Sequence, residues 1–505
     1  MALASTYSAT LEGFSARTVT VEVNIGPGLP GVHMVGLGDA AVKESRDRIR
    51  TAVANSALPW PRTKVMVSLS PAHLPKAGSH FDLPVALAVI GALDPRAPLV
   101  LERTMFLGEL GLGGRLRRVE RILPMLLAAP EDVEHIVIPA ENAAEAELLG
   151  HDRILAAHSL SEVWNWICGS CELHLPRGTL VDAPVATADF RDIAGQAEER
   201  FALEVAAAGG HHVLMVGPPG TGKSMLAERL PSILPPLKRS EMIEATAIHS
   251  VCGAASPFAG GIVASRPFIA PHPSLRQAAL IGGGAGSPRP GAVSQAHHGV
   301  LFLDEASEIN AAVLDSLRIP LETGVVRLTR ARATVTYPAH FQLVLAANTC
   351  KCAATVPAAC TCRAQERAAH LRNLSGPLRD RIDISLRTTT QDAVLNPANA
   401  ESSAAIAQRV AAARERAAHR WREMDTTLNA RVNSTTIRRE FPATEDAMAY
   451  LAALLARGAL TQRGVDRVLK LCWSLADLDA STQPNLDHVA RAVDLRTADL
   501  AGIAA

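Results

Sequence analysis

The stretch Gly217-Pro218-Pro219-Gly220-Thr221-Gly222-Lys223-Ser224 decides the fold of this chain. It fits the phosphate-loop pattern G-x-x-x-x-G-K-[ST]. The apolar run 212–216 before it predicts a strand, and the segment that begins at Met225 predicts a helix. Glycines in such a turn let backbone N–H groups converge on phosphate oxygens at a helix N-terminus, where the helix dipole favours anions. The sequence therefore predicts a nucleoside-triphosphate site in an α/β domain.

Two side chains of this loop and an acidic pair predict hydrolysis. Lys223 is expected to reach the β- and γ-phosphates, and the Ser224 hydroxyl is expected to ligate Mg²⁺. The run 300–303 predicts a buried strand, and Asp304 and Glu305 follow it directly. After a phosphate loop, Asp304 is expected to hold Mg²⁺ through water, while Glu305 polarises the attacking water. ATP and Mg²⁺ are thus the predicted ligands.

Further signals follow between and beyond these motifs. The glycine-rich stretch 282–291 is a loop that no packed core requires, so we expect an insertion before the acidic strand. Another apolar run, 342–347, predicts a strand that ends at Asn348. An Asn in that place orients water beside the γ-phosphate, although an ordinary turn Asn is the alternative. The segment 375–383 carries arginines that suit a finger reaching a neighbouring subunit, but from these residues alone a surface salt-bridge cluster is the simpler interpretation.

Together these motifs resemble the magnesium-chelatase/MCM branch of the AAA+ ATPases. Four further segments resemble the ComM/YifB family within that branch, and these are Gly195-Gln196, 206–211, 279–284 and 289–291. The resemblance covers nearly the whole chain and implies an arginine finger at Arg381 and a sensor-2 arginine at Arg463. It also implies a ring, expected to be a hexamer, and an ATP-driven DNA motor that promotes branch migration during recombination in natural transformation. DNA, single-stranded or branched, and further copies of this chain are the implied partners.

Composition along the chain divides it into four parts. Residues 1–168 mix strand-like runs with helical segments, and residues 169–190 form a linker marked by Pro and Gly. Residues 191–395 make up the ATPase core. Residues 396–505 are rich in Ala, Arg, Leu and Glu at helical spacing, which predicts a helical lid. The expected fold class is α/β.

The first of these parts carries a second resemblance. Its segment 75–82, followed by an apolar helix, is similar to a turn of Lon-type proteases. The position of the nucleophilic serine falls on His80, and that of the lysine base falls near Leu123. A Ser–Lys dyad needs a hydroxyl and a desolvated amine in contact, and Ser79 is one residue away from the required place. We therefore expect a Lon-like fold without peptidase activity.

A basic segment and a cysteine cluster predict two other sites. The β-prone run 325–337 contains three arginines and no acid, and in rings of the resembled branch a hairpin here faces the central pore. The expected contacts to DNA phosphates are Arg327, Arg330 and Arg332; a strand edge guarded by charge is the alternative. The cluster has a C-x-C…C-x-C spacing and consists of Cys350, Cys352, Cys360 and Cys362. Four thiolates suit a structural Zn²⁺ site, and reduced thiols in a loop are the alternative.

Charge and hydropathy bound the remaining choices. The chain has 505 residues, with 50 Lys and Arg against 50 Asp and Glu, which excludes a uniformly basic nucleic-acid binder but not a local basic surface. No basic residue precedes Arg17 and no signal-peptide pattern is present, so we expect a cytoplasmic protein without a membrane partner. Two other functions stay open: a magnesium-chelatase subunit that drives Mg²⁺ into a porphyrin, and an ATP-dependent Lon-like protease. The Lon-like domain and the cysteine loop argue against the chelatase, and the missing dyad argues against the protease.

Overall fold

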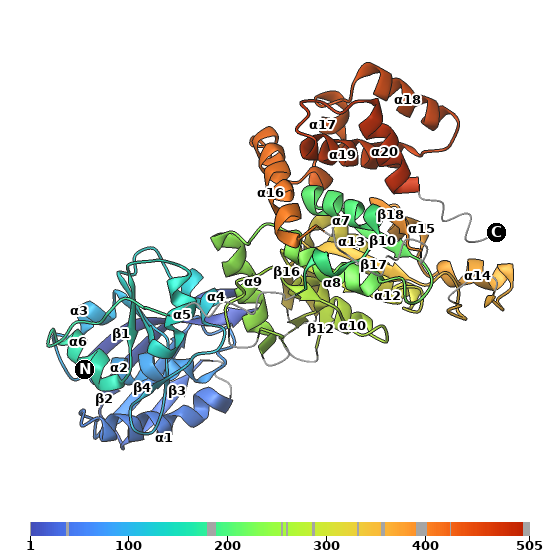
Figure 1. Cartoon of the computed structure of the whole chain (residues 1–505). Coiled ribbons are helices and arrows are strands. Elements are labelled where there is room, and N and C mark those ends of the chain that lie inside the picture. The colour runs from blue at the N-terminus through green and yellow to red at the C-terminus, as the bar shows by residue number, and fades with distance from the viewer. Residues whose placement is uncertain are drawn as a thin grey trace.

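A computed structural model describes residues 2–36, 40–178, 188–253, 256–258, 261–284, 288–330, 333–354, 359–389, 401–424 and 426–497. Figure 1 shows three parts that follow one another along the chain. The first is an α/β domain drawn in blue and cyan, the second is a central α/β domain, and the third is a group of helices drawn in orange and red. The mixed α/β fold with a helical C-terminal part confirms the predicted fold class.

A seven-stranded mixed sheet forms the centre of the first domain. Its strands, in the order β3-β4-β2-β1-β5-β8-β9, are β3 (Gly31–Val35), β4 (Lys64–Ser70), β2 (Ser15–Gly26), β1 (Ala2–Glu12), β5 (Thr104–Phe106), β8 (His135–Pro139) and β9 (Ile154–Ala157). β1 and β2 pair antiparallel from Ala2 opposite Ile25 to Glu12 opposite Ser15. In β4 every second residue is buried, as expected for a strand with one face in the core.

One buried helix crosses the core of this domain. The helices are α1 (Ala40–Asn55), α2 (Asp82–Gly91), α3 (Pro98–Leu101), α4 (Ile122–Leu127), α5 (Ala143–Glu147) and α6 (Leu160–Ile167), and a small pair of strands is β6 (Glu109–Leu110) with β7 (Leu116–Arg117). Every residue of α2 is buried. Its Asp82 accepts an ion pair from Arg48 at 2.6 Å. Burial raises the pKa of Asp82 to about 6, although the bond from Arg48 opposes that rise.

None of the helices in the described ranges is both long and apolar enough to cross a membrane.

The first residues of the predicted linker belong to this domain. Leu173 is buried in the same apolar core as β2 and α2. The N–H of Ala156 in β9 donates to the carbonyl of His174 at 2.9 Å. These contacts extend the domain beyond residue 168, while residues 179–187 lie outside the described part of the chain.

The central domain contains a parallel five-stranded sheet. Its strands, in the order β11-β14-β17-β10-β18, are β11 (Phe268–Ile269), β14 (Val300–Leu303), β17 (Gln342–Ala347), β10 (Val213–Val216) and β18 (Ile384–Arg387). β10, β14 and β17 are buried along their whole length. Continuous apolar runs of this kind suit a parallel sheet that is covered on both faces. Because all pairs are parallel, residues 217, 304 and 348 lie together at the carboxyl ends of their strands.

Helices and two insertions surround this sheet. The helices are α7 (Ala197–Gly209), α8 (Lys223–Ile233), α9 (Arg239–Cys252), α10 (Gln277–Leu280), α11 (Ala292–Gln295), α12 (Ala311–Asp315), α13 (Arg318–Thr323), α14 (Ala364–Leu371) and α15 (Gly376–Arg379). The glycine-rich insertion forms a short ladder of β12 (Gly282–Gly283) and β13 (Arg289–Pro290). A second insertion is the antiparallel hairpin of β15 (Val325–Arg330) and β16 (Ala333–Pro338). A Cβ on Gly282 would lie 3.0 Å from Leu328, so the first insertion packs closely against the hairpin.

The C-terminal part is helical, as predicted. Its helices are α16 (Ser403–Arg420), α17 (Ser434–Arg439), α18 (Glu445–Ala456), α19 (Gln462–Leu478) and α20 (Leu486–Thr497). Trp421 is fully buried in its core, in edge contact with Phe441 and Trp473. The indole N–H of Trp421 donates to Asn429 at 2.8 Å, which satisfies the polar atom of this buried ring.

Ion pairs to two buried carboxylates connect the helical part to the central domain. Asp383 comes directly before β18 and is fully buried. Arg467 of α19 forms an ion pair with Oδ1 of Asp383 at 2.8 Å. The other carboxylate oxygen of Asp383 accepts from the N–H of His212 at 3.1 Å. Arg409 of α16 pairs with Glu204 of α7 at 2.6 Å.

Within the described part of the chain, the first domain contacts the central domain through α9 and through the turn between β1 and β2. Nε of Arg239, the first residue of α9, donates to the carbonyl of Leu148 at 2.7 Å, and Figure 1 shows α9 beside α4 and α5. The turn between β1 and β2 touches the base of the hairpin. There the ring of Phe14 meets Tyr337 edge-on with centroids 6.5 Å apart, and a Cβ on Gly13 would lie 2.2 Å from Val335. Glycine is required at position 13, since φ there is also +68°.

Candidate active site

The phosphate loop lies between β10 and α8, as its sequence predicts. Gly220 and Gly222 have φ values of +77° and +76°, a region that residues with a Cβ rarely adopt. Gly217 has no room for a side chain, because a Cβ there would lie 2.1 Å from Oγ1 of Thr388. The loop leads into the N-terminus of α8, whose first residue is Lys223. This arrangement turns backbone N–H groups toward one point at the positive end of a helix.

Lys223 is held inside the loop by three acceptors. Its Nζ donates to the carbonyls of Gly217 at 2.9 Å and Pro218 at 2.7 Å, and to Oδ1 of Asn348 at 3.2 Å. The residue is 7% exposed. Burial lowers the pKa of Lys223, and the nearby Asp304 raises it. The structure therefore brings Lys223 and Asn348, predicted from motifs far apart in the sequence, into direct contact.

A second contact joins the loop to the acidic strand. The hydroxyl of Ser224 donates to Oδ2 of Asp304 at 2.7 Å. The other carboxylate oxygen of Asp304 accepts from the N–H of Glu305 at 2.8 Å. Glu305 has a φ of +47°, is exposed, and makes no hydrogen bond or ion pair through its side chain within the described chain. The pair thus divides into one carboxylate fixed on the loop and one that is free to act on solvent.

Two residues outside the loop, to which the sequence assigned no role, support it through contacts with Thr221. Nε2 of Gln196 donates to the carbonyl of Thr221 at 2.6 Å. The hydroxyl of Thr221 lies 2.7 Å from that of Thr388, the residue after β18. Gln196 itself has a φ of +52°. In the sequence, Gln196 was marked only as part of the pair Gly195-Gln196, which contributed to the family resemblance. No local pattern identified Thr388.

These residues fit a nucleoside triphosphate with Mg²⁺. A Cβ on Gly220 would meet nothing within 4 Å, so this part of the turn is open. The ammonium of Lys223 contacts three neutral oxygens, which are two backbone carbonyls and the amide oxygen of Asn348. The hydroxyl of Ser224 and the carboxylate of Asp304 are oxygen donors of the kind that Mg²⁺ prefers. The donor set agrees with the predicted ligands.

The structure does not bring the two predicted arginines to this site. Arg381 is 8% exposed; its guanidinium donates to the carbonyl of Pro377 at 2.6 Å and pairs with Glu322 of the same chain. Arg463 is exposed in the first turn of α19. Across the described ranges, neither side chain forms a hydrogen bond or ion pair with the loop or the acidic pair. Arg379, two positions before Arg381, is exposed. The roles of Arg381 and Arg463 stay predictions.

The basic hairpin has one apolar and one polar face. Val326 and Leu328 are buried, whereas Arg327 is exposed on the opposite face. Arg330 is also exposed, at the end of β15 on the side of Val326 and Leu328. Arg327 lies opposite Thr336 in the ladder, and among the described residues neither arginine has a carboxylate partner. Arg332 lies outside the described residues.

The predicted cysteine cluster is assembled in space. Sγ of Cys350 lies 3.2 Å from that of Cys352 and 3.6 Å from that of Cys360, and the four ligand atoms, with Cys362, all lie within 4.8 Å of one another. A Zn–S bond of about 2.3 Å in a tetrahedron places sulfurs about 3.8 Å apart. Hydrogen bonding among the thiols lowers the pKa of Cys352. The spacing of the sulfurs suits one tetrahedral metal ion.

The Lon-like residues of the first domain have structural partners. The hydroxyl of Ser79 donates to Glu109 rather than to an amine. His80 is buried, and its Nε2 lies 2.8 Å from the carbonyl of Ala9. Leu123, near the position of the dyad lysine, packs in an apolar cluster with Ala247 of α9. The two positions of the dyad are thus engaged in packing and in domain contact.

Family models match three consecutive parts of the chain. The model described as magnesium chelatase, subunit ChlI, matches residues 189–395, and that of its C-terminal region matches residues 400–496. A third model, subunit ChlI of Mg-chelatase, matches residues 21–142.

Several relatives are similar over the whole chain. An uncharacterized protein of Mycobacterium tuberculosis (strain H37Rv) is 47% identical over 98% of this chain and 99% of its own. Protein YifB of Salmonella typhimurium is 38% identical over 99% of this chain and 98% of its own. Competence protein ComM of Haemophilus influenzae is 37% identical over 98% of each chain.

Two matches are partial. Lon protease 2 of Bacillus subtilis is 34% identical over 28% of this chain and 26% of its own, which agrees with a Lon-like domain. The magnesium-chelatase 67 kDa subunit of Heliobacterium mobile is 27% identical over 32% of this chain and 28% of its own.

Proposed function

Because the chain belongs to the ComM/YifB family of magnesium-chelatase-like AAA+ proteins, we propose that it is an ATP-driven, ring-forming DNA motor that acts in recombination. Membership of this family implies ATPase activity with ATP and Mg²⁺. The name of the Haemophilus relative connects the family with competence, and a role in processing incoming DNA follows from it. The match to the magnesium-chelatase subunit of Heliobacterium mobile covers a third of the chain, whereas YifB and ComM match over nearly its whole length, so metal insertion into a porphyrin is the weaker alternative.

The observation that carries the DNA proposal is the pair of exposed arginines on the β15–β16 hairpin. Arg327 lies on its polar face and Arg330 at the end of β15 on the other face, and neither has a carboxylate partner among the described residues. Guanidinium groups bind phosphate oxygens well, and contacts to phosphates give affinity without reading sequence. The buried face of the same hairpin packs against the ATPase core through Val326 and Leu328. A basic surface fixed on the ATPase core suits a motor that tracks a DNA backbone.

The chain's own residues divide the work of hydrolysis. Lys223 binds the β- and γ-phosphates, while Ser224 and Asp304 are the residues that would hold Mg²⁺, which supplies charge neutralisation there. Asn348, in contact with Lys223, orients the attacking water, and the free carboxylate of Glu305 accepts its proton.

The arginine finger requires a neighbouring subunit. We infer that Arg381 leaves Glu322 of its own chain when subunits assemble, because its guanidinium is bound within the same chain in the structure. Arg463 acts at the same shared site from the helical part. A ring of six subunits would provide every site with these groups.

One experiment tests the proposal as a whole. ATP turnover is measured with no DNA, with single-stranded DNA and with branched DNA, while the mass of the assembly is measured with bound nucleotide. We expect a multimer of ring size and at least a several-fold stimulation by DNA. The double variant Arg327→Gln/Arg330→Gln should keep its turnover without DNA and lose the stimulation. Arg457→Gln, at an exposed arginine of the helical part, is the matched control. A monomer that ignores both DNAs would contradict the proposal.

We also propose that the four clustered cysteines hold a structural Zn²⁺. The cluster follows β17 and Asn348 directly, so a metal there would stabilise the loop that leaves the ATPase site.

A further inference from the structure

A pocket of about 560 Å³ lies at the amino ends of the strands of the ATPase sheet, opposite to the phosphate loop. His298 and Gly299 line it directly before β14, and Gln342 lines it at the start of β17. The phosphate loop, in contrast, follows the carboxyl end of β10. Because the strands are parallel, the pocket and the ATP site open at opposite ends of the same sheet.

The pocket has one wall on the ATPase core and one on the helical part. The core side includes residues 234–236 and Lys238, which follow the end of α8, and Arg266. The helical side includes Arg414 of α16 and the segment 426–428. Helix α8 begins at Lys223 in the ATP site and ends at this pocket, so one rigid element reaches both sites.

Positive charge is in excess in this pocket. Four cationic side chains line it, and these are Lys238, Arg266, Arg414 and Arg431, against the two carboxylates of Glu241 and Glu415. Glu241 is already engaged: it pairs with Arg266 at 3.3 Å and accepts from the N–H of Lys238 at 2.9 Å. Within the described residues neither Arg414 nor Arg431 has an ion pair.

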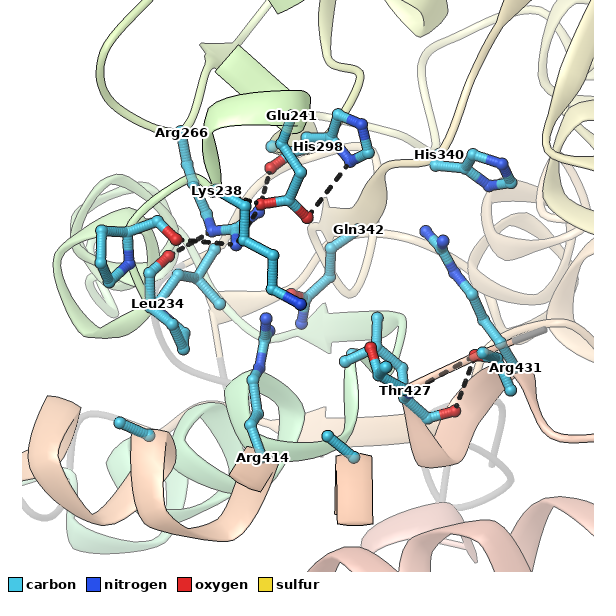
Figure 2. Close-up of a pocket in the computed structure, with 18 of the residues that line it drawn as sticks. Leu234, Lys238, Glu241, Arg266, His298, His340, Gln342, Arg414, Thr427 and Arg431 are labelled. Atoms are coloured by element: carbon cyan, nitrogen blue, oxygen red, sulfur yellow. Dashed lines mark hydrogen bonds and ion pairs between the residues drawn. The ribbon is translucent and has the colours of Figure 1, made fainter. Parts of the chain in front are cut away.

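The orientation of the cations favours a shared ligand. Figure 2 shows that the side chains of Lys238 and Arg414 both point into the pocket, with Arg266 beside Glu241 and with Arg431 near His340. Nε of Arg414 donates to the carbonyl of Ala207 at 2.8 Å, which fixes the guanidinium in place. Preorganised guanidinium groups bind phosphate oxygens in pairs.

The cationic side chains of the pocket also repel one another. Burial lowers the pKa of Arg414 to about 9, and the like charge of Arg266 contributes to this shift. Burial, followed by the effect of Arg431, lowers the pKa of His340 to about 4, so this ring is neutral at pH 7. An anion between the arginines would relieve their repulsion.

We propose that this pocket is a second anion site, which binds a small molecule with two or more linked phosphate groups. Its volume lies in the range of small-ligand pockets, about 300–1,000 Å³. Its two walls come from different parts of the chain, so the bound phosphates join the ATPase core to α16. The source of the phosphates is either a free nucleotide or an inorganic polyphosphate, which share this chemistry.

The test uses the full-length Lys223→Ala protein, which weakens phosphate binding at the loop, in buffer without Mg²⁺. Calorimetric titrations with tripolyphosphate, pyrophosphate and ADP should each show binding. Arg414→Gln on this background should weaken tripolyphosphate at least tenfold. Lys238 is exposed, so Lys238→Gln tests the same pocket without disturbing the packing of α16. Arg457→Gln should leave the affinity unchanged. Tighter binding of ADP than of pyrophosphate would identify a nucleotide as the ligand, and equal binding would identify an inorganic polyphosphate.

Two results would overturn the proposal. One is tripolyphosphate affinity that is absent, or that stays the same in both Arg414→Gln and Lys238→Gln. The other is an oligonucleotide that loses affinity in both variants while tripolyphosphate does not bind, which would assign the pocket to nucleic acid. Neither result depends on DNA stimulation of the ATPase, so this proposal and the proposed motor function fail separately.

Discussion

The hydroxyl of Ser224 lies 2.7 Å from Oδ2 of Asp304, although the two residues are 80 positions apart. This contact joins the first turn of α8 to the end of β14. It brings together the two oxygen donors expected to hold Mg²⁺. The phosphate loop and the acidic strand therefore form one preorganised site.

The first prediction concerns this pair. Asp304→Asn keeps the shape of the side chain but removes the charge that attracts Mg²⁺. We expect turnover at fixed Mg²⁺ to fall about 10- to 100-fold and to recover in part at higher Mg²⁺. Steady-state ATPase assays across a Mg²⁺ titration check this. Glu308→Gln, at an exposed carboxylate on the same loop, should behave like the unchanged protein. Equal Mg²⁺ dependence in all three proteins would remove Asp304 from the metal site.

The second prediction separates nucleotide binding from chemistry. Lys223→Ala should lose both ATP affinity and turnover, the latter about 100-fold or more, because the charge on the β- and γ-phosphates is no longer balanced. Glu305→Gln should bind ATP with nearly the normal affinity while turnover falls by a similar factor, since only the proton acceptor is lost. Titration with a fluorescent ATP analogue and single-turnover hydrolysis measure the two effects. Wild-type turnover in Lys223→Ala would show that the site has been assigned wrongly.

The third prediction concerns the cysteine cluster. Protein purified by gel filtration without chelator should contain one Zn²⁺ per chain by elemental analysis. Cys352→Ser should lose the metal, because three thiolates do not close a tetrahedral site. Cys168→Ser, at an exposed cysteine outside the cluster, should retain it. Four freely reactive thiols and no metal in the unchanged protein would disprove the zinc site.

The fourth prediction concerns acid stability. His249 is 1% exposed, and burial lowers its pKa to about 4, against 6.5 for a free ring. Between these values the unfolded chain binds the proton and the folded chain does not, so the contribution of this ring is complete above pH 6.5 and is lost as the pH falls toward 4. The free energy of unfolding should therefore fall by about 3 kcal/mol through this one ring as the pH is lowered from above 6.5 to below 4.

Urea unfolding from pH 7 to pH 4.5 measures this dependence. His249→Gln should reduce the slope of the free energy of unfolding by up to about 1.4 kcal/mol per pH unit. His419→Gln, at an exposed ring of α16, should leave the slope unchanged. Identical slopes in all three proteins would show that His249 already carries a proton in the folded state.

The fifth prediction concerns the helical part. Trp421 is fully buried between Phe441 and Trp473, so Trp421→Ala leaves a large cavity and removes the indole N–H that donates to Oδ1 of Asn429. We expect a loss of about 3–5 kcal/mol in the free energy of unfolding. Tyr450→Ala, at a side chain 37% exposed, should cost less than about 0.5 kcal/mol. Denaturant unfolding followed by far-UV circular dichroism compares the two. Equal losses would place Trp421 outside the core.

Local patterns predicted much of the fold and of the ATP site. The apolar runs before the loop, before Asp304 and before Asn348 are strands β10, β14 and β17, because continuous apolar runs are typical of a buried parallel sheet. Helical spacing beyond residue 400 predicted the helical part for a similar reason. The contact of Lys223 with Asn348 follows from parallel strands ending at one edge.

Other features depend on contacts that no local pattern encodes. The sequence does not show that Arg381 is buried against Glu322, since the two residues lie on separate elements. Nor does it show that Thr388 supports Thr221, or that His174, within the predicted linker, pairs with Ala156 of β9. The pocket around Arg414 is made of segments from both the core and α16, so its charge becomes visible only in three dimensions.

The contact between the rings of Phe14 and Tyr337 limits which shortened versions of this protein can be studied. A shortened version that starts near residue 188 would remove the β1–β2 turn and the surface that covers Ala247 and Val335. The shortened ATPase domain would then expose an apolar patch beside the β15–β16 hairpin, and we expect it to aggregate. Assays of the ATPase are therefore best made on the full-length chain, in which the Lon-like domain covers this apolar surface.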